Sequence, residues 1–437
     1  MEGRTPQSRV WHDRAARSMT GGVPSSYQAR DPWPIYLTHG LGAKVWDVDG
    51  NEYTDFHNAF GSMIQGHAHP AIVAAVQERI TLGSHFSMPT EDSVVVSEEL
   101  ARRFGLPMWR YVNSGSEATM DAIRIARGVT GRETIIKIFG SYHGHHDYVM
   151  VSIGTPYADI GPADNMNSLG YGEGIPQAVI DLTVAVPFNN AAAMETRIEH
   201  LEAEGRAPAC VIMEPAMMNL GVVLPEPGYL EAVRDITRRH GIVLIFDEVK
   251  TGLCVAAGGA TEKFGVRPDM VTMAKALGGG LPTGAIGATE EIMDIVLSDR
   301  VKQVGTYSGN PLSMAAARAN LFEVLTPDAY AHLDRLNDLL IAGCDEILKR
   351  HGLPGYTVGI SSKGCIHFTD APITDYTSFM EHQNAALPEL AWLYNANRGV
   401  LMAPGREEEW TLSVQHTDDD VSRYLDSLDA MAADFTA

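Results

Sequence analysis

The chain has 437 residues, of which 45% are hydrophobic and 20% are charged. This composition is that of a globular protein, and the length favours two domains or one large α/β domain with additions. The formal net charge of −22 argues against sequence-independent binding to nucleic acid or to an anionic membrane, and no apolar run reaches membrane-spanning length.

The cysteine pattern and the first residues of the chain favour a cytoplasmic protein. The four cysteines are scattered without metal-type spacing, which fits a reducing compartment. Residues 1–6 lack the apolar core of a signal peptide. We therefore expect the protein in the cytoplasm.

The N-terminal part of the chain combines an irregular segment with a hairpin. The first forty residues contain several prolines and are expected to be irregular. A hairpin is predicted next, with strands at 43–48 and 51–56 on either side of the turn pair Asp49-Gly50. Two amphipathic helices are then predicted, at 92–103 and 118–127.

Apolar runs alternate with amphipathic segments through the middle of the chain. This alternation predicts a mostly parallel sheet that is covered by helices on both faces. A helix at 312–325 is expected to lead into a smaller α+β tail, whose last helix is predicted at 418–432. The buried parallel strands are predicted at 134–138, 210–213, 242–246 and 270–273.

Lys275 follows the last of these predicted strands and precedes three glycines. Burial lowers the pKa of a lysine and frees its lone pair, which suits a nucleophile that forms a Schiff base. The alternative is an ordinary lysine before a loop, and for an isolated Lys-Gly pair that alternative would prevail. The polar residues at the ends of the other predicted strands favour the interpretation of Lys275 as a nucleophile.

Polar residues at other strand ends complete a candidate site, because ligands of open α/β sheets lie beyond the carboxyl ends of the strands. Ser114, Gly115 and Ser116 precede a helix and could hold a phosphate, or could form a plain helix cap. Tyr142 could cover a flat heterocycle, or could pack in the core. The histidines that follow it lack a second cluster with zinc-type spacing, so no metal is expected.

An acid and a polar loop extend this pattern. Asp247 ends a very apolar strand, where a carboxylate is costly unless it pairs with a cation such as a protonated pyridine nitrogen. A helix cap or a salt bridge is the alternative. The loop at 305–311 could add the hydroxyl of Thr306 to an anion site, or could be a surface turn. Together these residues describe a site for pyridoxal 5′-phosphate, PLP.

On these motifs the chain resembles a class III aminotransferase of the fold-type-I PLP-dependent superfamily, in the branch of glutamate-1-semialdehyde 2,1-aminomutase. The resemblance covers nearly the whole chain, although the tail matches more loosely. The matching stretches are 21–23, 46–51, 66–70, 113–118, 142–145, 246–249, 275–280 and 305–311.

The resemblance implies a role for each matching residue. Lys275 would form the Schiff base with PLP, Asp247 would pair with the ring nitrogen, and Tyr142 would stack on the ring opposite Val249. Thr306 would reach the phosphate of a neighbouring subunit, which implies a homodimer with shared active sites. Further cofactor contacts would come from Ser114, Gly115, Ser116, His143, Glu214 and Asn219.

The resemblance also implies a division of the chain into three parts. An N-terminal segment, 1–60, would pack with the small domain. The large PLP-binding domain would span 61–311, and the small C-terminal domain would span 312–437.

Departures from the aminomutase pattern concern the substrate. The family's Asn-Ser-Pro-Val-Arg segment, whose arginine holds the substrate carboxylate, ends here in Gln28. Losing that cation is not conservative. The family's Met-Thr-Gly-Phe-Arg is Lys-Thr-Gly-Leu-Cys at 250–254, and 84–88 also differs. The substrate residues are expected to be Ser25, Gln28, Arg30 and Glu408.

We therefore predict a PLP-dependent aminotransferase. It would move an amino group between an amine or a non-standard amino acid, β-amino acids included, and a keto acid or aldehyde. The alternative is the aminomutase, for which the glycine-rich segment 154–176 could act as a gating loop or be a surface excursion. A catalytically inactive protein of the same fold is disfavoured because Lys275, Asp247 and Tyr142 are all retained.

Overall fold

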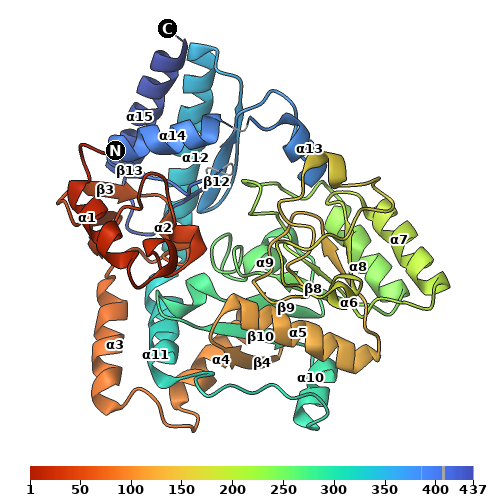
Figure 1. Ribbon diagram of the computed structural model, residues 1–437. Coiled ribbons are helices and arrows are strands. Elements are labelled where there is room, and N and C mark those ends of the chain that lie inside the picture. Colours follow the sequence, from red (N-terminus) through yellow and green to blue (C-terminus); the bar gives the residue numbers. More distant parts are fainter. Residues whose placement is uncertain (385, 406–408, 437) are drawn as a thin grey trace.

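A computed structural model describes residues 1–384, 386–405 and 409–436. Its centre is a seven-stranded sheet in the order β4-β10-β9-β8-β7-β5-β6 (Figure 1). The strands of this sheet are β4 (Met108–Val112), β5 (Ile135–Ile138), β6 (Thr183–Val186), β7 (Cys210–Met213), β8 (Val243–Asp247), β9 (Met270–Met273) and β10 (Gly284–Ala288).

The sheet is mostly parallel. Only β10 is antiparallel to its neighbours, β4 and β9, so the other six strands run in one direction. The predicted α/β class and the four buried parallel strands are thereby confirmed. The strands β4, β6 and β10 were not predicted.

Helices cover both faces of the sheet and form most of the remaining structure. The helices are α1 (Pro6–Ala15), α2 (Asn58–Gly61), α3 (Pro70–Leu82), α4 (Glu91–Phe104), α5 (Gly115–Thr130), α6 (Gln177–Ile180), α7 (Ala191–Ala203), α8 (Tyr229–Arg239), α9 (Gly259–Phe264), α10 (Glu290–Leu297), α11 (Pro311–Ala319), α12 (Pro327–His351), α13 (Tyr376–His382), α14 (Leu387–Asn397) and α15 (Asp418–Thr436). Short 3-10 turns lie at Thr20–Gly22, Ser26–Gln28, Tyr157–Asp159 and Lys275–Gly278, and a π-helical turn continues α11 over Asn320–Val324.

The central strands are apolar on both faces because each face has its own core. Val211 and Met213 of β7 belong to the larger hydrophobic cluster, while Cys210 and Ile212 belong to the cluster under α5 and α10. Successive side chains of a strand point to opposite faces, so a strand between two cores reads as a continuous apolar run. This is why these strands could be predicted from sequence.

Two smaller sheets join distant parts of the chain. One has the order β1-β2-β3-β13 and the other the order β11-β12-β14. In the first, β13 pairs in parallel with β3, which places the N-terminal segment beside the C-terminal part (Figure 1). Their strands are β1 (Leu37–Leu41), β2 (Lys44–Asp47), β3 (Glu52–Asp55), β11 (Tyr356–Ile360), β12 (Lys363–His367), β13 (Val400–Leu401) and β14 (Trp410–Thr411).

The predicted hairpin is confirmed as β2 and β3, but the expectation of an irregular N-terminus is wrong over α1. This helix is strongly polar, so it lacks the apolar stripe that marks a helix in sequence. Its start is held from a distance by Asp49, whose carboxylate accepts from the backbone N–H groups of Gln7, at 2.6 Å, and Ser8, at 3.0 Å. Such a long-range cap leaves no local signal.

The helix predicted after Pro311 is confirmed as α11 with its π-helical turn. It packs against α3 and α4 of the large part of the molecule. Among the described residues, no helix is long and apolar enough to cross a membrane.

The ion pair between Arg234 and Asp269 links α8 to the central sheet and provides a test of the packing. Asp269 accepts from Arg234 Nη1 at 2.7 Å and Nη2 at 2.9 Å, and from the backbone N–H of Leu244 at 2.8 Å. We expect Asp269→Ala to lower the free energy of unfolding by about 1–3 kcal/mol, because a partly buried guanidinium loses both bonds. Thermal melting measures the change.

The control is Lys302→Ala, which removes an exposed ion pair with Asp299. Exposed pairs contribute less than about 1 kcal/mol, so this variant should melt close to the wild type. Equal losses in the two variants would contradict the role given to Asp269.

Candidate active site

The carboxyl ends of five strands meet at one edge of the central sheet. Because β4, β5, β7, β8 and β9 run in the same direction, the residues that follow them lie together. A cavity of about 1010 Å³ opens at this edge. The predicted residues that line it are Arg30, Ser114, Gly115, Ser116, Tyr142, His143, Glu214, Asn219, Asp247, Val249 and Lys275.

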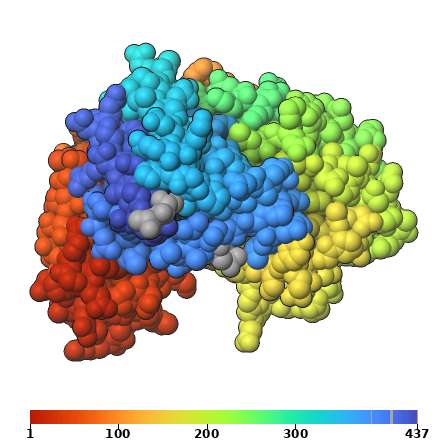
Figure 2. Space-filling view, turned by 90° about the horizontal axis from the view of Figure 1, so that it is seen from above, coloured from red at the N-terminus to blue at the C-terminus, as the bar shows by residue number. Residues whose placement is uncertain are grey.

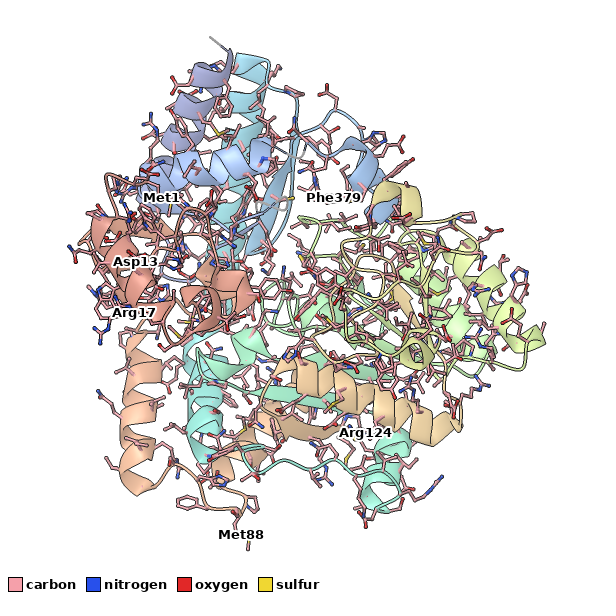
Figure 3. All side chains as sticks on the ribbon, in the orientation of Figure 1. Met1, Asp13, Arg17, Met88, Arg124 and Phe379 are labelled. Carbon is pink, nitrogen blue, oxygen red and sulfur yellow. The ribbon has the colours of Figure 1, made fainter. Side chains whose placement is uncertain are left out.

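The cavity also receives residues from the rest of the chain. Tyr27 comes from the N-terminal segment, Tyr171 from the connection between β5 and β6, and Phe379 from α13. Figure 3 labels Phe379, which lies where the C-terminal part faces the large part of the molecule. Figure 2 shows the surface notched between the red N-terminal segment and the yellow segment of the large part.

Lys275 lies two residues beyond β9, where the backbone leaves the sheet. Its φ is 44°, a left-handed conformation that is uncommon for a residue with a side chain. Burial, and after it the positive charge of Lys250, lower the pKa of the Lys275 amine to about 8, against the opposing effect of Asp247. The unprotonated fraction of this amine near neutral pH is therefore much larger than that of an ordinary lysine.

Asp247 ends β8 and is 3% exposed. Its Oδ2 accepts from Nδ1 of His143 at 2.7 Å, and its Oδ1 accepts from the Thr272 hydroxyl at 3.0 Å and from the Val249 backbone N–H at 3.1 Å. Burial lowers the pKa of His143, so the ring is neutral and donates from Nδ1. These donors hold a buried carboxylate in one orientation at the cavity wall.

The N-terminus of α5 forms the polar end of the cavity. The Ser114 hydroxyl caps the helix by accepting from the Glu117 N–H at 3.2 Å. The first N–H groups of a helix, here those of Gly115 and Ser116, have no partner within it and are available to an anion. The Ser116 hydroxyl accepts from the His145 N–H at 3.1 Å, which ties the loop after β5 to this end.

Two glycines allow the close approach of backbones around that helix end. A Cβ at Gly144, whose φ is +100°, would lie 2.5 Å from the Ser116 Oγ. A Cβ at Gly115 would lie 3.1 Å from Cγ1 of Val249. The cradle therefore requires glycine at position 144, while a side chain at position 115 would require Val249 to shift.

Glu214 and Asn219 form a pair on the same wall. Asn219 Nδ2 donates to Glu214 Oε2 at 3.0 Å. Burial raises the pKa of Glu214 to about 8, so this carboxyl group is mostly protonated at neutral pH. It can then donate a hydrogen bond as well as accept one.

The structure does not bring all predicted substrate residues to the cavity. Arg30 lines it, but Ser25 and Gln28 do not. Gln28 turns back on its own 3-10 turn, where its Oε1 accepts from the Ser25 N–H at 3.2 Å. Glu408 lies outside the described residues.

Thr306 lies apart from the other predicted residues. It lines a second hollow of about 770 Å³, together with His85, Tyr111 and Ser308. The contact of Thr306 with a neighbouring subunit stays a prediction.

Residues that the sequence analysis did not assign to the site also line the cavity. Lys250 is one of them, at a position where the resemblance implies methionine. Its Nζ donates to Glu409 Oε2 at 2.8 Å and to the Met218 carbonyl. The aromatic lining residues that sequence reasoning did not assign are Tyr27, Phe60, Tyr171, Tyr376 and Phe379.

The residues of the cavity fit PLP. The helix end offers N–H groups to a phosphate, Asp247 offers a carboxylate to a ring nitrogen, and Tyr142 offers an aromatic face. Lys275 supplies an amine with a lowered pKa on the same cavity. Among the described residues, no group of three or more His, Cys, Asp or Glu is placed to hold a metal ion.

Comparisons with known proteins agree with this fit. Residues 26–371 match the model of the family "Aminotransferase class-III". The chain is 39% identical over 422 residues to glutamate-1-semialdehyde 2,1-aminomutase 2 of Brevibacillus brevis, with 94% of this chain and 95% of that protein covered.

Solved structures of transaminases are similar over almost the whole chain. An omega-transaminase from Sphaerobacter thermophilus has a TM-score of 0.93 and 34% identity, covering 98% of this chain and 97% of that one. A β-phenylalanine aminotransferase from Variovorax paradoxus has a TM-score of 0.88 and 26% identity, covering 99% and 95%. The chain belongs to the class III aminotransferase family.

Proposed function

We propose that this PLP-dependent class III enzyme moves an amino group between two molecules. The donor would be an amine or a non-standard amino acid, β-amino acids included, and the acceptor a keto acid or aldehyde. The observation that carries the proposal is that Lys275 and Asp247 line one cavity while Gln28, in place of the family's carboxylate-binding arginine, does not. The two transaminases of similar structure support intermolecular transfer.

Each residue would contribute a specific physical effect. Bound PLP supplies an electron sink that stabilises negative charge on the substrate carbon. The Lys275 Nζ would take a proton from that carbon and deliver it to C4′ of the cofactor, because return to the same carbon would transfer no amino group. The Asp247 carboxylate, fixed by His143 and Thr272, would hold a proton on the ring nitrogen. The N–H groups of Gly115 and Ser116 would bind the phosphate.

A homodimer is part of the proposal. Thr306 lies away from the cavity of its own chain, in a hollow bounded by the segment 85–89. In a dimer it would complete the phosphate site of the partner, as the resemblance implies. The active sites would then be shared between subunits.

The aminomutase reaction is the second candidate, and the sequence comparisons support it better than they support intermolecular transfer. The B. brevis relative, matched over nearly its whole length, is an aminomutase. The sequence at position 28 favours the first candidate, because the carboxylate-binding arginine of the aminomutase family is absent there. A direct assay separates the two.

The assay gives the purified enzyme glutamate-1-semialdehyde alone, or a β-amino acid with a keto acid. A charge-assisted pair contributes about 1.5–3 kcal/mol. Without the arginine, we expect kcat/KM for glutamate-1-semialdehyde at least about tenfold below that for the better intermolecular pair. Efficient formation of 5-aminolevulinate without an added acceptor would establish the aminomutase instead.

Asp247→Asn tests the group that faces the ring nitrogen. We expect the turnover rate to fall by about 10²–10³-fold, because the amide cannot stabilise a positive charge on the ring. Steady-state rates with a saturating amino donor measure the change. Asp426→Asn, at an exposed site on α15, is the matched control and should keep its rate. A near-wild-type rate for Asp247→Asn would show that another group holds the proton.

The lowered pKa of Lys275 can be measured without turnover. In protein stripped of cofactor, acylation of Lys275 should be half-maximal near pH 8, since burial and Lys250 disfavour the ammonium form. The exposed Lys263 serves as the reference site. Peptide mass spectrometry follows both sites in one sample. Identical pH profiles would refute the lowered pKa.

A further inference from the structure

Lys137 is a buried lysine that the proposed chemistry does not use. It lies in β5 and is 0% exposed. Its Nζ donates to the backbone carbonyl of Ser141 at 2.8 Å and to that of Val151 at 2.7 Å. Among the described residues, no carboxylate forms an ion pair with this amine. Lys137 is therefore held by the backbone of one segment, 141–151, which we call the β5 loop.

The two carbonyls lie at the two ends of the β5 loop. The N–H of Gly140 donates to the carbonyl of Ser152 at 2.9 Å, which brings the flanking backbone together. The Lys137 amine joins the next residue inward on each side, Ser141 and Val151. A single side chain therefore fixes both ends of the loop.

The β5 loop carries residues of the cavity. Tyr142 and His143 line the cavity, whereas Lys137 does not. The carbonyl of Ser141 and the N–H of Tyr142 belong to one planar peptide unit. A hydrogen bond to that carbonyl therefore restricts the backbone from which the Tyr142 side chain extends. Through this peptide unit, Lys137 acts on a residue of the site that it does not itself reach.

Helix α5 holds the middle of the same loop. The Thr119 hydroxyl donates to the carbonyl of His143 at 2.6 Å, and the Ser116 hydroxyl accepts from the N–H of His145 at 3.1 Å. These bonds attach the loop to the helix whose N-terminus fits the phosphate. Lys137 supplies the bonds that attach the ends of the loop to the central sheet.

A lysine in the middle of a buried strand is costly, because its amine loses the water that surrounds it in the unfolded chain. The other residues of β5, Ile135, Ile136 and Ile138, are apolar. Burial also lowers the pKa of Lys137 to about 7. The hydrogen bonds to the β5 loop are the compensation that the structure shows for this residue.

We propose that Lys137 is a positioning residue of the cofactor site, which fixes the β5 loop and so holds the Tyr142 side chain in the orientation that PLP requires. It is not a catalytic residue, because it does not line the cavity. The inference rests on the part of the proposed function that places PLP beside Tyr142. It does not depend on which amino substrate the enzyme uses.

The affinity of the cofactor-free protein for PLP tests this role without turnover. Lys137→Met removes the donors and keeps most of the side-chain volume. We expect the dissociation constant for PLP, measured by absorbance titration, to rise about 10- to 100-fold. The visible circular dichroism of the bound cofactor should weaken, since its ring is held less firmly. Lys137→Gln keeps an N–H donor and should recover part of the affinity.

Ile135→Ala separates positioning from a general loss of stability. Ile135 is buried two residues from Lys137, on the same strand and the same face. The cavity left by this substitution should lower the melting temperature, while the affinity for PLP should stay that of the wild type. Wild-type PLP affinity in Lys137→Met would overturn the proposal. Failure of both Lys137 variants to fold would indicate a purely structural role and would overturn it as well.

A double-mutant cycle tests the route through Tyr142. Tyr142→Ala removes the side chain that the loop presents. We expect Lys137→Met to change the affinity for PLP at least about threefold less in the Tyr142→Ala background than in the wild type. Strictly multiplicative losses would contradict the route. Absence of amino transfer from every donor tried, with these affinities as expected, would overturn the proposed function and leave the role of Lys137 in place.

Discussion

The burial of charge at one edge of a parallel sheet is the constraint on which the site depends. Six strands share a direction, so the ends of β7, β8 and β9 place Glu214, Asp247 and Lys275 around one cavity. Each of these buried groups must lose its charge or have that charge stabilised by hydrogen bonds. Glu214 is protonated, Asp247 is fixed by three donors, and the pKa of Lys275 is lowered to about 8. The same electrostatics that make the site costly make its amine reactive.

The residues that line the cavity come from two kinds of segment. The residues that fit PLP come from short motifs directly after strands, whereas the cavity wall opposite is built from the N-terminal segment, the connection before β6 and the C-terminal part. The N-terminal, connecting and C-terminal segments can change without disturbing the residues that fit PLP. This separation explains how the chain retains the family's cofactor residues and has no arginine at position 28.

The sequence was sufficient for those parts of the fold that depend on local pattern. Strands between two cores are apolar throughout, and β7, β8 and β9 were therefore predictable. The strand β10 contains two glycines and three small or branched residues, Gly284 to Ala288, and its antiparallel direction depends on the loop after Lys275. The helix α1 was missed because Asp49 caps it from a distant hairpin.

The same distinction holds for the site. Motifs within a few residues of each other, such as 113–117 and 246–249, could be predicted because strand direction brings them together. The ion pair of Lys250 with Glu409 joins residues 159 positions apart, so no spacing reveals it. Gln28 was predicted to contact the substrate, but its side chain is held in its own turn by a hydrogen bond to the Ser25 N–H, which composition does not specify.

Two lysines line one cavity, and the proposed chemistry depends on which of them bonds to the cofactor. Reduction of the purified holoenzyme with borohydride, followed by peptide mass spectrometry, identifies that residue directly. We expect a stable pyridoxyl adduct on Lys275 and an unmodified Lys250. An adduct on Lys250, or no adduct on either lysine, would contradict the assignment of Lys275.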